Sequence, residues 1–141
     1  MATSETPPIL RDKHYDALSA FTPESLLREA LQEQLAKAWP ELQIVAACDD
    51  GASALDEIVA HQPDVAFLDI RMPGLNGIEI AEAMATASPA TQVVFVTAYD
   101  QYAIDAFDKG AIDYLLKPVS YDRLTSTIQR LQTRAAAGSV G

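Results

Sequence analysis

The sequence predicts an α/β fold: a doubly wound parallel sheet of five strands covered by helices. Two observations support this prediction. Short apolar runs alternate along the chain with segments in which apolar residues recur at helical spacing. The runs are also nearly continuous in apolar residues, which is typical of parallel strands buried on both faces. A chain of 141 residues with 49% hydrophobic residues is large enough to bury the core of one domain.

Five segments are predicted to be strands. The last four are strongly apolar, and we expect them to be parallel and central in the sheet. The first, ALSAF, is short and poor in β-branched residues, but without it the first helix would have no partner strand. The predicted strands are residues 17–21, 42–47, 65–68, 93–97 and 112–116.

Helical spacing of apolar residues predicts helices around 27–38, 55–59, 80–84, 103–107 and 124–131. Residues with ordinary capping chemistry mark their ends. Thr22-Pro23 precedes the first helix, Asp100 and Ser120 precede the fourth and fifth, and Gly110 follows the fourth. Prolines 40, 63 and 89 each stop the helix before them.

The ends of the chain differ in composition from its middle. Residues 1–13 are expected to form a flexible N-terminal arm, and residues 135–141, rich in small side chains, a C-terminal linker or tail. The predicted domain therefore spans residues 14–134.

Charge and composition limit the possible functions. The formal net charge is −10, so direct binding to nucleic acid is not expected. There is no apolar run of about 18 residues and no secretory leader pattern, which predicts a cytoplasmic protein without a membrane partner. The single cysteine, Cys48, lies in an apolar run and is predicted to be a buried, unreactive thiol.

Three polar side chains follow predicted strands directly. Asp69 comes after the third strand, Thr97 ends the fourth, and Lys117 follows the fifth. In a doubly wound sheet the ligand site lies at the carboxyl ends of the strands, so these residues should meet. A carboxylate nucleophile, a hydroxyl donor and an ammonium suit phosphoryl transfer. The alternative is a structural Asp69–Lys117 ion pair with a nearby threonine, and spacing alone does not separate the two.

Two longer stretches, LDIRMPGLNGIE and FVTAYDQYAIDAFDKGAIDYLLKP, resemble the receiver domain of bacterial two-component response regulators. The second stretch is most similar to receivers of LytTR-type regulators, and the resemblance covers roughly residues 17 to 132. It implies a flavodoxin-like, CheY-like fold with strand order 2-1-3-4-5.

The resemblance also implies roles for individual residues. Asp69 would be the phosphoacceptor, Thr97 would move toward the phosphoryl group, and Lys117 would contact it. Tyr114 would rotate inward as Thr97 shifts; the less favoured alternative is a sheet-end aromatic residue with a hydrated hydroxyl. Pro118 would follow a cis peptide bond.

Two further residues near Asp69 are expected to be structural. Gly77 should serve the backbone geometry at the start of the third helix, and Met72 should pack.

Magnesium is the doubtful cofactor. The family pattern implies Asp69 and the Arg71 backbone carbonyl as ligands. Where receivers end the first strand with an acidic pair, however, this chain has Thr22-Pro23, leaving only Glu24. Asp49-Asp50 is an acidic pair after the second strand, and it is interpreted as a turn and helix cap. A weakened and an absent magnesium site both stay open.

Two functions follow. The first is a phosphorylation-driven switch in two-component signal transduction, and the alternative is a phosphorylation-independent pseudo-receiver that lacks a competent magnesium site. Expected partners are a sensor histidine kinase and a second copy through the helix 4–strand 5–helix 5 face, which is formed by the predicted segments 103–107, 112–116 and 124–131. DNA would be reached only through a separate output domain acting in transcription regulation. No enzyme activity is expected, because an aspartate phosphatase would carry a second aspartate where Arg71 stands and no GxGxxG loop follows a strand.

Overall fold

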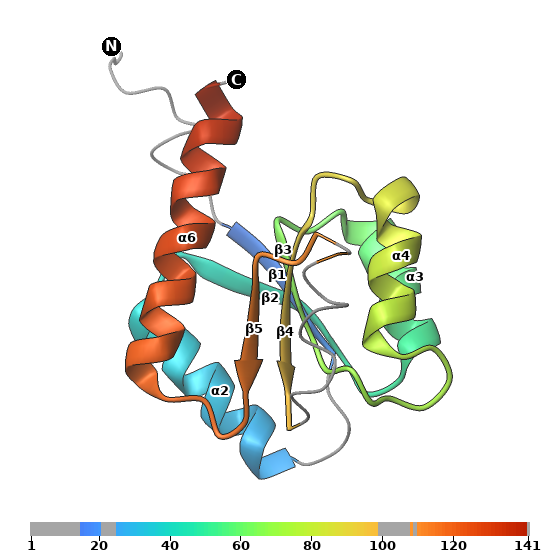
Figure 1. Ribbon diagram of the computed structural model, residues 1–141, viewed down its shortest axis with the longest axis horizontal. Coiled ribbons are helices and arrows are strands. Elements are labelled where there is room, and N and C mark those ends of the chain that lie inside the picture. Colours follow the sequence, from blue (N-terminus) through green and yellow to red (C-terminus); the bar gives the residue numbers. More distant parts are fainter. Residues whose placement is uncertain (1–14, 21–24, 99–107, 109, 141) are drawn as a thin grey trace.

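The computed structural model (Figure 1) describes residues 15–20, 25–98, 108 and 110–140. Its core is a five-stranded sheet with the order β2-β1-β3-β4-β5, in which every neighbouring pair is parallel. The predicted fold class and strand order are therefore confirmed.

All five predicted strands are present, with ends that differ by one or two residues from those expected. The strands are β1 (Tyr15–Ala20), β2 (Leu42–Cys48), β3 (Val65–Leu68), β4 (Gln92–Thr97) and β5 (Asp113–Leu116). The expectation that the last four strands are all central is wrong for β2 and β5, which form the edges of the sheet. The apolar run of β2 is only partly buried, whereas every residue of β3 is buried.

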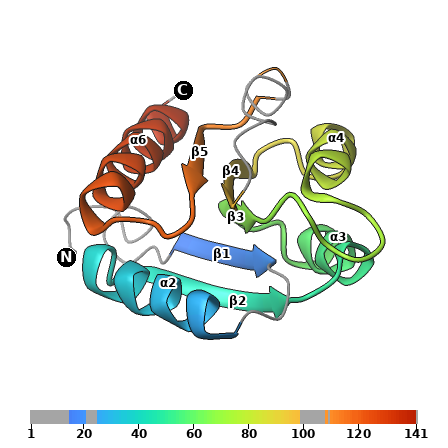
Figure 2. The ribbon, with the colours of Figure 1, turned by 60° about the horizontal axis from the view of Figure 1, so that its bottom comes forward.

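The described helices are α2 (Ser25–Ala38), α3 (Gly51–His61), α4 (Gly77–Ala87) and α6 (Tyr121–Val140). Figures 1 and 2 show α2 and α6 on one side of the sheet and α3 and α4 on the other. The predicted helix around 103–107, together with Thr22, Pro23 and Asp100 as caps, lies outside the described residues.

The period of two in β3 divides the core between the two helical layers. Ala66 and Leu68 belong to the cluster that α3 and α4 cover, and Val65 and Phe67 belong to the cluster under α2 and α6. All four residues are at most 1% exposed. Both faces of the central strand are thus closed by apolar side chains, and polar chemistry is confined to the ends of the sheet.

Several helix ends carry ordinary capping chemistry. Asp50 caps α3 and accepts hydrogen bonds from the Ser53 amide at 2.8 Å and hydroxyl at 2.9 Å. Asn76 and Glu79 form a reciprocal capping box on α4. Ser120 caps α6 through the Arg123 amide at 3.2 Å, as predicted.

Two segments differ from their sequence interpretation. His61, which lies beyond the helix predicted around 55–59, is the last residue of α3 and lies 3.8 Å from Glu57. Helix α6 continues to Val140, into the segment interpreted as a linker or tail. The domain limits themselves stay a prediction.

Candidate phosphoacceptor site

Asp69 lies directly after β3, at the edge of the sheet where β3, β4 and β5 end. Asp69 itself is only 4% exposed, although the loop that follows it lies at the surface. The strand register pairs Leu68 with Phe95 and Thr97 with Leu116, so Asp69, Thr97 and Lys117 come to one place. The convergence predicted from strand ends is therefore found.

The Asp69 carboxylate is paired with Lys117. The Lys117 Nζ lies 2.9 Å from Asp69 Oδ2, and the two side chains are 10% and 5% exposed. The other carboxylate oxygen, Oδ1, accepts a hydrogen bond from the Arg71 amide at 3.3 Å. Burial makes this pair more than a surface contact, because removing one partner would leave the other charge poorly hydrated.

Thr97 joins the pair from the neighbouring strand. It is fully buried at the end of β4, and its backbone carbonyl accepts a hydrogen bond from the Lys117 amide at 2.8 Å. The Lys117-Pro118 peptide bond is cis, as the resemblance implied. The backbone of β4 thus fixes where the Lys117 side chain starts.

Tyr114 lies in β5, the strand that leads to Lys117, and is paired with Phe95 of β4. It is 8% exposed, and its ring packs on Phe95 with the centroids 6.2 Å apart and the planes at 51°. The ring therefore belongs to the core cluster in this state of the protein. Its inward rotation on phosphorylation stays a prediction.

The loop that follows Asp69 ends at Gly77, whose backbone contacts the start of the loop. The Gly77 amide donates to the Ile70 carbonyl at 2.9 Å, and a Cβ at this position would lie 2.3 Å from the Asp69 carbonyl oxygen. The predicted geometric role of Gly77 is confirmed. Met72 is buried in the core, which confirms its packing role.

The described residues do not complete a magnesium site. Asp69 supplies one carboxylate, and Arg71 lies in the loop where its backbone carbonyl was predicted to be a ligand. Thr22, Pro23 and Glu24 are outside the described residues. In the part of the chain that the structure describes, no group of three or more His, Cys, Asp and Glu side chains could hold a metal ion. A hard divalent cation prefers several oxygen ligands, so the described residues alone do not form a complete site for it.

In the acidic pair Asp49-Asp50, the Asp50 carboxylate is already used as a helix cap. The Ser53 amide and hydroxyl, donating to the Asp50 side chain, lower the pKa of Asp50, which confirms this residue as a helix cap. Nearby Cys48 is buried as predicted, and burial together with Glu57 raises the pKa of its thiol. Its charged, reactive form is thereby disfavoured.

Sequence reasoning missed a second buried carboxylate. Asp113 begins β5, is fully buried, and accepts two hydrogen bonds from Arg123 at 2.8 and 2.6 Å. Thr127 adds a bond of 2.6 Å, and Arg130 lies 3.3 Å away. Burial alone would raise the pKa of Asp113, but the bonds from Arg123 and Thr127 hold it below its usual value. The sequence pattern that could have shown this cluster is an aspartate interrupting an apolar strand, followed by Arg123 and Thr127 one helical turn apart.

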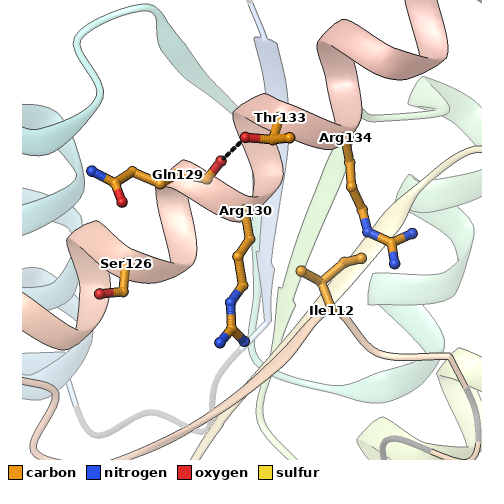
Figure 3. Close-up of a pocket in the computed structure, with 6 residues that line it drawn as sticks. All are labelled: Ile112, Ser126, Gln129, Arg130, Thr133 and Arg134. Atoms are coloured by element: carbon orange, nitrogen blue, oxygen red, sulfur yellow. Dashed lines mark hydrogen bonds between the residues drawn. The ribbon is translucent and has the colours of Figure 1, made fainter.

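A groove runs beside this cluster, between α6 and the start of β5 (Figure 3). Its volume is about 660 Å³, and Arg130 and Arg134 extend into it from adjacent turns of α6. Together with Arg123, these two arginines concentrate positive charge on α6 in a chain whose net charge is −10. The groove is lined by Ile112, Ser126, Gln129, Arg130, Thr133 and Arg134.

Comparison with known proteins identifies the class. Residues 23–129 match the model of the response regulator receiver domain. An uncharacterized response regulatory protein of Vibrio cholerae is 53% identical over 109 residues, which are 77% of this chain and 42% of that protein. The sensory transduction protein LytT of Bacillus anthracis is 38% identical over 107 residues, 76% of this chain and 43% of that protein.

Solved structures agree with this assignment. The REC domain of AraT, a response regulator from Geobacillus stearothermophilus, superposes with a TM-score of 0.81 at 27% identity, covering 90% of this chain and 99% of that one. The response regulatory domain of mrkE from Klebsiella pneumoniae gives a TM-score of 0.76 at 30% identity, covering 84% and 96%.

The chain belongs to the family of response regulator receiver domains, which act in two-component signalling. It spans less than half the length of the two relatives above, 42% and 43%. Among the described residues, no helix is long and apolar enough to cross a membrane.

Proposed function

We propose that this receiver domain accepts a phosphoryl group on Asp69 and thereby switches its interaction with a partner or an output domain. The observation that carries the proposal is the buried contact of 2.9 Å between Asp69 and Lys117, at the edge of the sheet where Thr97 also ends its strand. The nucleophile, its counter-cation and a hydroxyl donor are thus within one small site.

Each of these groups has one role in the proposed transfer. An oxygen of the Asp69 carboxylate attacks phosphorus, the bond from phosphorus to the donor's histidine nitrogen breaks, and an acyl phosphate forms. The Lys117 ammonium, which neutralises the carboxylate before transfer, then contacts a phosphoryl oxygen. The Thr97 hydroxyl donates to another phosphoryl oxygen, which draws the end of β4 toward Asp69. Tyr114, one strand further along the sheet, rotates further inward as Thr97 moves.

Magnesium binding is proposed to be weak. Threonine and proline stand at 22 and 23, where the family pattern has acidic residues, and threonine offers only a neutral oxygen while proline offers none in its side chain. With few carboxylates to hold the cation, Lys117 is the principal counter-charge of the phosphoryl group. Transfer from small phosphodonors is therefore expected to be slow.

The same departure favours a second candidate function. A pseudo-receiver would keep the fold and the Asp69–Lys117 pair as structure and bind its partner without phosphorylation. What supports it is that the ion pair already satisfies both charges in the unmodified protein. What supports the first function is that Asp69, Thr97 and Lys117 meet at one edge of the sheet and that Tyr114 lies on β5, which leads directly to Lys117.

The partners proposed are a sensor histidine kinase and, on the output side, a surface that includes β5 and α6. The groove of Figure 3 lies on the described part of this surface and would serve association with a second copy. The relatives' greater length is consistent with a LytTR-type DNA-binding output domain in a longer parent protein, through which the receiver would regulate transcription.

A phosphotransfer assay tests the proposal. The chain is incubated with a phosphorylated histidine kinase domain, and modified peptides are located by mass spectrometry beside an Asp69→Asn control. One phosphoryl group on the peptide that contains Asp69, absent from the variant, is the expected result. An unmodified wild type that still binds its partner would favour the pseudo-receiver.

A further inference from the structure

The loop that carries Asp69 touches the start of α3 as well as the start of α4. The Gly51 amide, in the first turn of α3, donates to the Pro73 carbonyl at 3.0 Å. The first amides of a helix have no partner inside it, so the loop supplies one of the acceptors that α3 needs. The acceptor loop and α3 are thereby joined.

There is no room for a side chain at this contact. A Cβ on Gly51 would lie 1.9 Å from the Leu75 carbonyl oxygen and 2.7 Å from Leu75 Cβ. The φ of Gly51 is not in the left-handed region, so space and not conformation requires glycine here. Gly74 and Gly110 are the opposite case, with φ of +78° and +87° and no atom within 4 Å of an added Cβ.

Gly51 and Gly77 therefore hold the loop from two sides. Gly77 lies against the Asp69 carbonyl at the base of the loop, and Gly51 lies against Pro73 and Leu75 near its outer end. Leu75 also packs on the core cluster, and Met72 is buried within it. The backbone between Asp69 and Leu75, including Arg71, has little freedom to shift unless α3 gives way.

We propose that Gly51 is a positioning residue for phosphoryl acceptance at Asp69, because its close contact with Pro73 and Leu75 sets the position of the acceptor loop. The inference rests on the proposed function, since it assigns a role in the reaction at Asp69. It extends the site to α3, whose first turn should respond when Asp69 is modified.

The test compares Gly51→Ala with Ile58→Val, a mild truncation of a fully buried residue about two turns further along α3. Capture of beryllofluoride, an analogue of the acyl phosphate, is followed by NMR. We expect Gly51→Ala to weaken capture roughly 10- to 100-fold, because displacing reacting groups by about 1 Å has effects of this size. Ile58→Val should capture as wild type does. Equal capture by wild type and Gly51→Ala would overturn the proposal.

Two readouts separate this inference from the function on which it rests. In the unmodified proteins, Gly51→Ala should shift the amide signals of Arg71 and Gly77, and Ile58→Val should not. If wild type captures no beryllofluoride, acceptance at Asp69 fails, while these shifts still show whether Gly51 positions the loop. Unchanged Arg71 and Gly77 signals would refute the positioning role.

The wild type alone provides a measurement should Gly51→Ala not fold. On addition of beryllofluoride the Gly51 amide signal should move more than that of Ser53, which lies in the same turn but is held by Asp50 and not by the loop. Equal movement of the two amides would contradict the coupling.

Discussion

Among the described residues, two buried carboxylates have cationic partners, and they differ in how many hydrogen bonds they accept. Asp113 accepts from Arg123 twice, from Thr127 and from the Tyr114 amide, with Arg130 also nearby. The described partners of Asp69 are Lys117 and, at 3.3 Å, the Arg71 amide. A carboxylate has about four acceptor positions, so Asp113 is saturated whereas Asp69 keeps capacity for another group.

Under the proposed function, this difference separates a structural carboxylate from one that can accept a phosphoryl group. Asp113 lies where β5 meets α6 and is fully buried, so its partners fix α6 to the edge of the sheet. Asp69 lies at the carboxyl end of β3, beside an exposed loop. A phosphoryl group could join Asp69 by displacing one ammonium, but it could join Asp113 only by dismantling the cluster.

The largest effect on stability is expected at Asp113. Arg123→Met removes two of its hydrogen bonds and leaves a fully buried carboxylate with weaker compensation, which should cost about 3 kcal/mol. Urea denaturation measures the loss. Arg134→Met is the matched control, because Arg134 is exposed and makes no ion pair with a described residue, and it should change stability by no more than about 0.5 kcal/mol. Equal losses of stability in the two variants would show that the Asp113 cluster has no special structural role.

A smaller loss of stability but a complete loss of function is expected at Lys117. Lys117→Met removes one charged hydrogen bond from Asp69 and should cost about 2 kcal/mol. Phosphoryl capture should disappear, since the principal counter-charge is gone, whereas Arg123→Met should still capture. Calorimetry with beryllofluoride on both variants separates the two carboxylates. Capture by Lys117→Met at the wild-type level would show that Asp69 does not depend on it.

The free energy of unfolding should depend on pH through the titration of Asp113. Its folded pKa is lowered by Arg123 and Thr127, so its contribution is fully present above its unfolded pKa of about 4 and is lost as the pH falls through the folded value. The difference in unfolding free energy between wild type and Arg123→Met should therefore be constant near neutral pH and shrink in acid. A difference that grows in acid would contradict this assignment.

The smallest effects concern the helix caps beside each carboxylate. Asn76→Ala breaks the reciprocal box at the end of the Asp69 loop and should cost about 1 kcal/mol. Ser120→Ala removes a single longer bond at the start of α6 and should cost less. Thermal unfolding ranks the two, and we expect slower phosphoryl capture in Asn76→Ala alone. Slower capture in both variants would mean that the two regions are not independent.

Sequence reasoning reached Asp69 but not Asp113, for a physical reason. Parallel strands end at one edge of the sheet, so knowing where each strand stops is enough to bring Asp69, Thr97 and Lys117 together. The Asp113 cluster depends on how α6 rotates against β5, which the apolar periodicity of the helix does not specify closely enough. The contact of Gly51 with Leu75 likewise depends on where one loop meets a helix from another part of the chain.

The edge positions of β2 and β5 show the same limit. Their apolar runs predicted strands correctly, but an apolar run does not reveal which strand has a neighbour on only one side. Strand order came from the family resemblance and not from the residues of the strands themselves.

The most direct test titrates the unmodified chain with magnesium and then measures capture of beryllofluoride. It asks whether phosphoryl acceptance at Asp69 relies on Lys117 more than on a metal ion. We predict weak magnesium binding by the wild type, stronger binding and capture by the Thr22→Asp/Pro23→Asp double variant, and no capture by Asp69→Asn. Pro23→Asp alone serves as a control for any change at the start of the first helix. Tight magnesium binding by the wild type that is abolished by Asp69→Asn would contradict the account, because other ligands would then complete an ordinary metal site.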